Sequence, residues 1–242
     1  MFFIQCYVLY RRLKAQNLIK MTELKKEKRG GINFFNCDNI EFMKTKPDNY
    51  YNLAIVDPPY GIGAGGKNFK SGTSSNSKIY RDTDWDSSIP SEEYFNELKR
   101  VSKNQIVWGG NYFFEYLGNC RCFIFWDKNQ PMDNYADGEL AWTSFDKVAK
   151  KYKKDWFGGL AKERDQNQRI HPTQKPIQLY RWILKTYAEK GNKILDTHGG
   201  SMSISIACDM EGFDLDICEI DAEYFRTGLY EFDRYKSQTK LF

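Results

Sequence analysis

The chain has 242 residues, of which 41% are hydrophobic and 28% charged, and these values suit a single α/β domain with a full core. The net charge of +4 permits nucleic-acid binding without requiring it. The six cysteines form no C-x-x-C pair and have no zinc-finger spacing to the two histidines, so the sequence predicts reduced thiols and no metal site.

The first thirty residues differ in character from the rest. The apolar run Phe2–Tyr10 is too short to span a membrane, and basic residues follow it rather than precede it, the reverse of a secretion signal. We therefore expect residues 1–30 to form an N-terminal extension, residues 31–242 to form one domain, and the protein to be cytoplasmic without a membrane partner.

From residue 31 onward, strand and helix signals alternate. Helices are expected after Pro90-Ser91, where two glutamates occupy the first turn, after the HPTQKP stretch at 171–176, and at Ser203–Glu211 and Ala222–Tyr235. Strands are expected at Ile32–Asn36, Leu53–Asp57, Gln105–Gly109, Cys122–Trp126, Glu139–Phe145, Lys193–Asp196 and Asp214–Glu219. This alternation predicts an α/β fold with a mostly parallel sheet covered by helices on both faces. Residues 61–90 and 146–170 are expected to be loops.

One strand ends in an unusual way. The stretch LAIVDPPYGIG runs from Leu53 into the carboxylate of Asp57, then two prolines and Tyr60. The prolines fix φ and remove two N–H donors, so the turn presents acceptors and an aromatic ring.

A second strand ends in a glycine turn. Asp196 is followed by Gly199-Gly200-Ser201 and a helix, and Glu219 ends the next strand about 20 residues after the glycines. An acid at that place accepts hydrogen bonds from ribose hydroxyls, although an ordinary βαβ turn with an exposed acid would look the same. The sequence has neither G-x-G-x-x-G nor a P-loop, which disfavours NAD and ATP and favours a cofactor without phosphate, such as S-adenosylmethionine.

Three motifs together carry a family resemblance. DPPY at 57–60, HPTQKP at 171–176 and ILDTHGGS at 194–201 resemble the amino-group DNA methyltransferases that use S-adenosylmethionine. The DPPY motif comes first, which is similar to the circularly permuted (beta) class. The connecting sequences at 100–113 and 126–144 resemble those of phage and prophage members of the family that methylate adenine N6. The resemblance implies a Rossmann-like methyltransferase fold with a mostly parallel seven-stranded sheet, and double-stranded DNA as the partner of a monomer or homodimer.

The resemblance also implies roles for individual residues. Catalytic roles fall on Asp57, Pro58, Pro59 and Tyr60. Cofactor-binding roles fall on Asp38, His171, Thr173, Lys175, Asp196, Gly199, Gly200, Ser201 and Glu219. His171, Thr173 and Lys175 would lie beside the carboxylate end of the cofactor. The sequence departs from the family pattern at Met202, where a second glycine is common, and at Asn36-Cys37-Asp38, where Gly-Asp is more usual.

The DPPY residues suit methyl transfer to an exocyclic amine. The lone pair of such an amine is delocalised into the base ring, and acceptors for both N–H groups favour a pyramidal, nucleophilic nitrogen. The carboxylate of Asp57 and the carbonyl of Pro58 are candidate acceptors, and Tyr60 is a candidate stacking surface for a flipped base.

Two basic segments are candidates for DNA contact, although solvated lysines would look the same. The first lies in the loop 61–90 and comprises Lys67, Lys70, Lys78 and Arg81, and the second lies in 146–170 and comprises Lys147, Lys150, Lys151, Lys153 and Lys154. Trp156 and Phe157 beside the second segment are candidates for packing or for filling the gap left by a flipped base.

Two alternatives remain open. Cytosine N4 needs the same chemistry, although that group more often has Ser-Pro-Pro-Tyr, so Asp57 favours adenine. A catalytically inactive DNA-binding relative would keep the fold, and Met202 is the departure that would fit it. Methyltransferases with Asn-Pro-Pro-Tyr that act on RNA or protein are disfavoured by the motif order.

Overall fold

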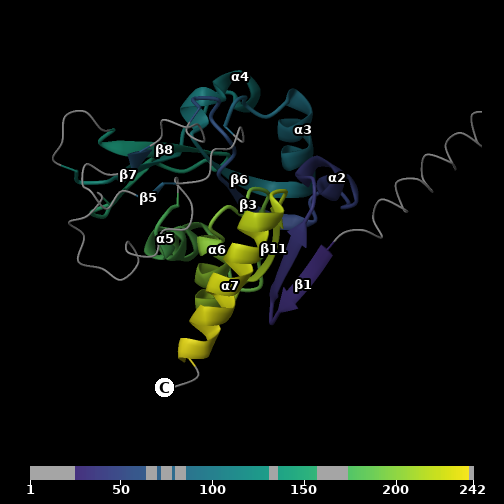
Figure 1. Cartoon of the computed structure of the whole chain (residues 1–242). Coiled ribbons are helices and arrows are strands. Elements are labelled where there is room, and N and C mark those ends of the chain that lie inside the picture. The colour runs from purple at the N-terminus through teal and green to yellow at the C-terminus, as the bar shows by residue number, and fades with distance from the viewer. Residues whose placement is uncertain are drawn as a thin grey trace, which may run out of the picture.

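The computed structural model describes residues 25–63, 86–130, 136–156 and 174–239, together with the backbone of 70–71 and 78–79. Figure 1 shows a central twisted sheet with helices on both sides. The sheet has nine strands in the order β1-β2-β11-β10-β3-β6-β8-β7-β9, and β4 and β5 form a separate pair.

The strands and helices have the following bounds. The strands are β1 (Lys25–Arg29), β2 (Ile32–Asn36), β3 (Tyr51–Val56), β4 (Lys70–Ser71), β5 (Lys78–Ile79), β6 (Ser102–Trp108), β7 (Phe123–Asp127), β8 (Gly138–Thr143), β9 (Lys150–Lys153), β10 (Lys193–Asp196) and β11 (Asp214–Glu219). The helices are α2 (Asn39–Lys44), α3 (Glu92–Val101), the 3-10 turn η1 (Gly110–Tyr112), α4 (Phe114–Leu117), α5 (Ile177–Tyr187), α6 (Ser203–Glu211) and α7 (Ala222–Thr239).

The centre of the sheet is parallel and its flanks are mixed. Strands β2, β11, β10, β3 and β6 pair in parallel, β1 is antiparallel to β2, and β8 is antiparallel to both β6 and β7. Strand β9 pairs in parallel with β7 at the far edge.

The expected seven-stranded sheet is therefore wrong in its strand count. The two outermost strands, β1 and β9, have the sequences KKEKR and KKYK, and most of their side chains are exposed. Edge strands need only backbone hydrogen bonds on one side, so they can form without the apolar pattern that reveals buried strands. Strand β1 lies within residues 1–30, which we expected to be an extension, and β9 lies within 146–170, which we expected to be a loop.

Both faces of the central sheet are buried. Along β3, Leu53 and Ile55 belong to one core cluster with residues of α5, α6 and α7, whereas Ala54 and Val56 belong to a second cluster with residues of α2, α3 and α4. A strand buried on both faces reads as a continuous apolar run, which explains LAIV. Helices on both faces, as expected, are confirmed.

Several predicted elements agree with the structure to the residue, namely β2, β10, α6 and β11. Helix α3 begins as its sequence predicts, because the Ser91 side chain accepts a hydrogen bond from the Tyr94 N–H, with Glu92 and Glu93 in the first turn. Helix α7 extends four residues past the expected end at Tyr235, to Thr239. Helix α2 was not predicted.

The topology brings three strand ends together. Strand β10 pairs in parallel with β3 on one side and β11 on the other, so the residues that follow all three lie at one edge of the sheet. In the described part of the chain, no helix has the length and apolarity needed to cross a membrane.

Candidate active site

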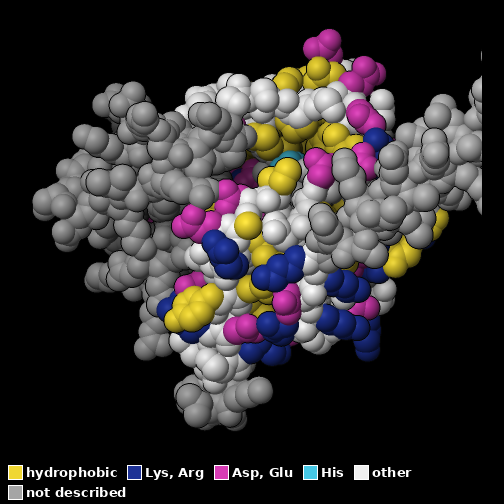
Figure 2. All heavy atoms as spheres, turned by 45° about the vertical axis from the view of Figure 1, so that its right-hand side comes forward, with side chains coloured by type: hydrophobic (Ala, Val, Ile, Leu, Met, Phe, Trp, Pro, Cys, Tyr) yellow, Lys and Arg dark blue, Asp and Glu magenta, His cyan; other side chains and the backbone are white. Residues whose placement is uncertain are grey.

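A cavity of about 250 Å³ lies at this edge. It is the hollow in the upper half of Figure 2, where acidic and hydrophobic side chains gather. The segments after β2, β3, β10 and β11 and the segment before α5 supply most of its wall, and helices α5 and α7 add Tyr180 and Tyr224. The wall consists of Cys37, Asn39, Asp57, Pro59, Gln174, Lys175, Tyr180, Thr197, His198, Gly199, Gly200, Ser201, Glu219, Ile220, Asp221 and Tyr224.

Glu219 is held rigidly at the end of β11. One carboxylate oxygen accepts the Gly200 N–H at 2.7 Å and the other accepts the Asp221 N–H at 2.8 Å. Burial raises the pKa of Glu219, and these backbone donors partly offset the rise. Each carboxylate oxygen has a second lone pair, so Glu219 can still accept hydrogen bonds from hydroxyls in the cavity.

The turn after β10 lets the backbone line the cavity closely. The Gly199 N–H donates to the Cys218 carbonyl at 2.7 Å, and a Cβ on Gly199 would lie 3.2 Å from that oxygen. Gly200 has φ +49°, a left-handed conformation that glycine adopts easily. The glycines therefore bring β10 and β11 together and leave the wall without side chains there.

Met202, at the position where the family resemblance implies a glycine, has a backbone conformation that glycine adopts easily. It has φ +55°, in the left-handed region where a glycine is common, and it is the N-cap of α6. Its side chain is buried against α7, because a Cβ on Gly228 would lie 2.6 Å from the Met202 sulfur. Met202 is absent from the cavity wall, so this departure leaves the cavity open.

His198 forms part of the wall next to the turn. Its two ring nitrogens lie 3.1 Å from Asn39 Nδ2 and 2.9 Å from Thr197 Oγ1, and Thr197 Oγ1 lies 2.7 Å from the Tyr94 hydroxyl. Burial lowers the pKa of His198 to about 3, so the ring is neutral at pH 7. His198, Asn39 and Thr197 therefore make this part of the wall polar and uncharged.

Asp57 has both carboxylate oxygens occupied. Oδ1 accepts the Tyr60 hydroxyl at 2.6 Å and Oδ2 accepts the Lys175 ammonium at 2.5 Å. Burial raises the pKa of Asp57, while the Lys175 charge acts in the opposite direction. Pro59 lines the cavity beside Asp57, whereas Pro58 is buried.

Lys175 joins two carboxylates. Its side chain is 1% exposed, and its Nζ lies 2.5 Å from Asp57 Oδ2 and 3.2 Å from Glu139 Oε2. Glu139 in turn pairs with Lys128 at 2.6 Å. The structure thus places the Lys175 ammonium against Asp57, whereas the family resemblance implied a place beside the cofactor carboxylate.

The charges in this cluster stabilise one another. Burial alone would raise the pKa of Glu139, but the positive charges of Lys175 and Lys128 outweigh it and lower that pKa to about 2. Burial alone would lower the pKa of Lys175, but Asp57 and Glu139 raise it above its usual value. Lys175 and Glu139 are therefore both charged across the physiological pH range.

A network of hydrogen bonds holds the turn that contains Tyr60. The buried carboxylate of Asp86 accepts the Tyr60 N–H at 2.6 Å and the Gly61 N–H at 2.9 Å. The Tyr60 ring stacks on Tyr112 at 5.0 Å between centroids and 13° between planes, and Tyr112 is 44% exposed. Gly109 makes room for this ring, because a Cβ there would lie 2.2 Å from Tyr60 Cε1.

The other predicted cofactor residues have different positions. Asp38 caps α2 by accepting the Glu41 N–H at 2.9 Å, while its neighbours Cys37 and Asn39 line the cavity. Asp196 is buried at the end of β10 and accepts the His198 N–H at 3.0 Å. His171 and Thr173 lie outside the described residues.

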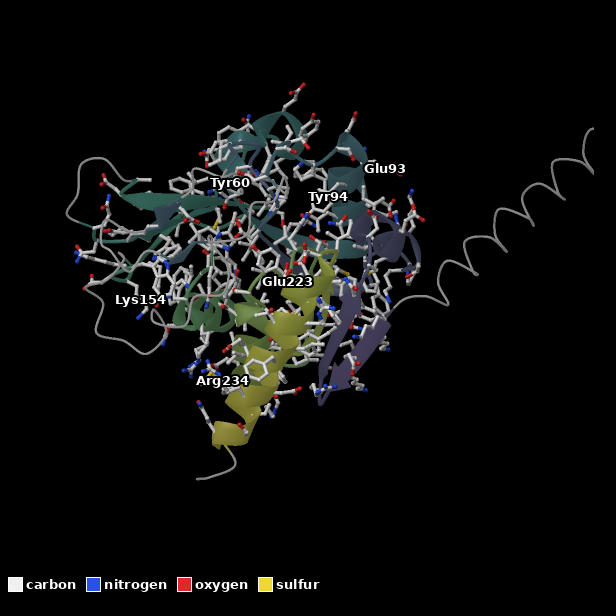
Figure 3. All side chains as sticks on the ribbon, in the orientation of Figure 1. Tyr60, Glu93, Tyr94, Lys154, Glu223 and Arg234 are labelled. Atoms are coloured by element: carbon white, nitrogen blue, oxygen red, sulfur yellow. The ribbon has the colours of Figure 1, made fainter. Side chains whose placement is uncertain are left out.

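The predicted DNA-binding lysines are only partly described. Lys150, Lys151 and Lys153 are exposed on β9, Lys154 follows them, and Lys147 is also exposed. Figure 3 shows Lys154 well away from Tyr60 and Tyr94. Lys67, Arg81 and Phe157 lie outside the described residues, as do the side chains of Lys70 and Lys78. Trp156 is buried against Trp126, at 6.0 Å between centroids.

Sequence reasoning missed several residues of the site. They are Cys37, Asn39, Asp86, Tyr112, Lys128, Glu139, Gln174, Tyr180, His198 and Tyr224. Cys37, Asn39 and His198 follow predicted strands by one to three positions, which is a usable signal. Within the described residues, no group of three or more His, Cys, Asp or Glu side chains could hold a metal ion.

Gly109→Ala should destabilise the fold more than Gly212→Ala. Both glycines have left-handed backbones, with φ +66° and +74°, so both variants carry the same conformational strain. Only the Gly109 variant also collides with a ring, at Tyr60, whereas nothing lies within 4 Å of a Cβ on Gly212. Urea unfolding should show a loss about 2 kcal/mol larger for Gly109→Ala; equal losses would contradict the tight contact.

Asp196→Asn should change how stability depends on pH. Burial, together with the nearby charges of Asp57 and Glu219, raises the pKa of Asp196 from 3.8 to about 7. Between these values the folded chain holds a proton that the unfolded chain releases, so stability falls as pH rises through this window. The asparagine cannot ionise and keeps an oxygen for the His198 N–H.

Unfolding free energies at pH 4.5 and pH 8 test this prediction. The unfolding free energy of Asp196→Asn, relative to that of the unaltered chain, should be higher at pH 8 than at pH 4.5 by a few kcal/mol. Asp38→Asn is the control, because asparagine caps a helix equally well on the surface. The same gain at both pH values would count against a buried, protonated Asp196.

Comparisons with known proteins agree with this geometry. Residues 123–229 match the N6_N4_Mtase family model, which describes a DNA methylase. The chain is 26% identical over 213 residues to the type II methyltransferase M2.MboI of Moraxella bovis, covering 73% of this chain and 78% of the relative.

Two solved structures share the fold. The M1.HpyAVI–SAM complex aligns with a TM-score of 0.52 and 20% identity, over 83% of this chain and 99% of the other. The cytosine-N4-specific PvuII DNA methyltransferase aligns with a TM-score of 0.56 and 13% identity, over 86% of this chain and 90% of the other. The family match and the relative show that this chain is similar to DNA methylases of the N6/N4 kind, and the two solved structures show that it shares their fold.

Proposed function

We propose that this chain transfers a methyl group from S-adenosylmethionine to the N6 amine of a flipped adenine in double-stranded DNA. The observation that carries the proposal is one cavity that contains both Asp57 of the DPPY turn and Glu219 with the Gly199–Ser201 turn. A donor site and an acceptor site for the methyl group are thus neighbours.

The chemistry of the wall fits this cofactor. Three carboxylates line the cavity, from Asp57, Glu219 and Asp221, and Lys175 is the one Lys or Arg among its described wall residues. Such a wall disfavours phosphates and accommodates a cation. When bound, S-adenosylmethionine supplies an electrophilic methyl group on a positively charged sulfur.

We assign the cofactor contacts as follows. Glu219 accepts the ribose hydroxyls, and the Gly199–Ser201 turn lies along the methionine part. Asp196 lies near the ammonium, whose positive charge would favour the ionised form of its buried carboxyl. His171 and Thr173 are proposed for the carboxylate end, on the resemblance alone. Asp38 acts there only by capping α2, which holds its neighbours Cys37 and Asn39 in the wall.

The DPPY residues act on the target amine. The Asp57 carboxylate and the Pro58 carbonyl accept its two N–H groups, which localises the nitrogen lone pair for attack. Asp86 fixes the turn in place, so these acceptors need little reorganisation when the base arrives. Tyr60 offers a ring face to the base, an interaction worth roughly 1–3 kcal/mol.

The strand arrangement supports the permuted class. Strand β3, which DPPY follows, comes earlier in the sequence than β10, which the glycine turn follows, yet the two pair side by side. The similarity to a type II methyltransferase favours a modification enzyme of a restriction–modification system. The phage-like subtype and the division into residues 1–30 and 31–242 remain predictions.

Adenine is proposed over cytosine because Asp57 begins the motif. The alternative, cytosine N4, has a specific observation in its favour, since a cytosine-N4-specific enzyme shares the fold. For DNA contact we propose the exposed Lys150, Lys151 and Lys153 of β9, with Lys154, and on the sequence alone Lys67, Lys70, Lys78 and Arg81.

Glu219→Ala should weaken cofactor binding about 10- to 100-fold, the usual value of hydrogen bonds to a charged group. Isothermal titration of the purified chain with S-adenosylmethionine measures the affinity. Glu223→Ala is the matched control, because Glu223 (labelled in Figure 3) is an exposed acid in the first turn of α7 and is not among the residues of the cavity wall. Equal affinities for the two variants would refute the ribose role.

Labelling tests the reaction itself. The chain is incubated with DNA and S-adenosylmethionine carrying a radioactive methyl group, and the DNA is digested to nucleosides. We expect the label in N6-methyldeoxyadenosine with the unaltered chain, and none with Asp57→Ala, which should still bind the cofactor. Label in N4-methyldeoxycytidine would show that the acceptor is cytosine N4 and not adenine N6. Turnover by Asp57→Ala would exclude the proposed role of Asp57.

A further inference from the structure

The proposed reaction needs an acceptor oxygen on Asp57, and each of its oxygens already accepts one hydrogen bond, so only second lone pairs are open to the amine. Tyr60 donates to Oδ1 at 2.6 Å, and Lys175 donates to Oδ2 at 2.5 Å. The Lys175 side chain is only 1% exposed, so its charge depends on nearby carboxylates rather than on bulk water. A target amine that donates to Oδ2 must therefore share that oxygen with a buried ammonium, whose positive charge makes the oxygen a weaker acceptor. The ammonium can leave Oδ2 only if another carboxylate balances its charge.

Glu139 is placed to be that carboxylate. Its Oε2 lies 3.2 Å from Lys175 Nζ but makes no hydrogen bond of good geometry there, and the atom is buried. Glu139 comes from β8, and its other oxygen is anchored by Lys128 at 2.6 Å. The Glu139 carboxylate is thus held in place by Lys128 and is charged, and its Oε2 atom has no well-formed hydrogen bond.

We propose that Glu139 is a positioning residue that receives the Lys175 ammonium when the target amine binds, which frees Oδ2 of Asp57. The inference rests on the proposed function, because it assigns the amine to Asp57. Lys175 keeps its proton throughout, and only its hydrogen-bond partner changes.

The surroundings of Lys175 permit the exchange. The ammonium lies 5.1 Å from the centroid of the Trp108 ring and 6.0 Å from that of Tyr60, so aromatic faces stabilise it between the two carboxylates. Two carboxylates and two lysines make the cluster neutral overall. Removal of Glu139 leaves Asp57 as the one close carboxylate partner of Lys175 among the described residues.

The test uses Glu139→Gln, which keeps the shape and removes the charge. At saturating DNA and cofactor, kcat should fall roughly ten-fold or more, the scale of coupling between contacting charges. Cofactor affinity and the KM for DNA should stay within about two-fold, because the ground-state contacts of Asp57 and Glu219 remain. In a Lys175→Gln background, adding Glu139→Gln should change kcat by less than about two-fold.

A pH profile separates this role from a merely structural ion pair. Without Glu139, the pKa of Lys175 falls, and at alkaline pH the lysine loses its proton and its hold on Asp57. The kcat of Glu139→Gln should therefore recover as pH rises, while that of the unaltered chain should not. The titratable groups that act on this cluster from the packed elements are Asp57, Tyr60, Lys128, Glu139, Tyr180 and Asp196.

Controls keep folding apart from the proposed role. Asp127→Asn removes a carboxylate from the end of the neighbouring strand β7, where its partner is Lys151, and should keep full activity. Glu139→Asp retains the charge at a shorter reach and should give an intermediate kcat. Thermal unfolding of all variants without cofactor identifies any that fail to fold. If Glu139→Gln is one of them, the kcat of Glu139→Asp is used for the test in its place.

Three outcomes decide the matter. If Glu139→Gln has normal kcat and a normal pH profile, this inference is overturned and the proposed function stands. A loss of kcat matched by an equal loss of cofactor affinity and no alkaline recovery would also overturn it, in favour of a structural ion pair. If the unaltered chain methylates neither base, the proposed function fails and this inference fails with it.

Discussion

The parallel pairing of β10 with β3 and β11 is the constraint on which the site depends. Parallel neighbours end at the same edge of a sheet, so a carboxylate, a glycine turn and a second carboxylate from distant parts of the chain meet there. The burial of both faces of β3 keeps this register, because a shift of one residue would exchange its two apolar sets. The cavity is therefore a consequence of strand order rather than of any single residue.

A charge cluster joins this edge to the antiparallel half of the sheet. Lys175 precedes α5, Asp57 follows β3 and Glu139 lies on β8, so one buried ammonium connects three separate segments. Buried ion pairs contribute little net stability, since desolvation offsets the attraction, but breaking one is costly. The cluster is thus better understood as fixing the position and ionisation of Asp57 than as strengthening the fold.

The elements that could be predicted from the sequence are those that depend on residues close together in the chain. Buried strands such as β10 and β11 show as apolar runs, and Ser91 with its two glutamates shows where α3 begins. The charged edge strands β1 and β9 were hidden, because backbone pairing leaves no pattern in exposed side chains. The partnership of Lys175 with Asp57 joins residues 118 positions apart, and that of Asp86 with the Tyr60 turn crosses a long loop. Such contacts depend on the tertiary fold and have no signature in spacing.

The lysines of β1 and β9 have a consequence for how copies of this chain can meet. Among the described residues, these two strands are the outer edges of the nine-stranded sheet, and the outer backbone groups of an edge strand can pair with another strand. Because KKEKR and KKYK border those edges, joining two sheets into a longer one would set lysine against lysine, a repulsion that only high salt would screen. Self-association by sheet extension, the usual route to aggregates of β-rich chains, is thus disfavoured by charge at both ends.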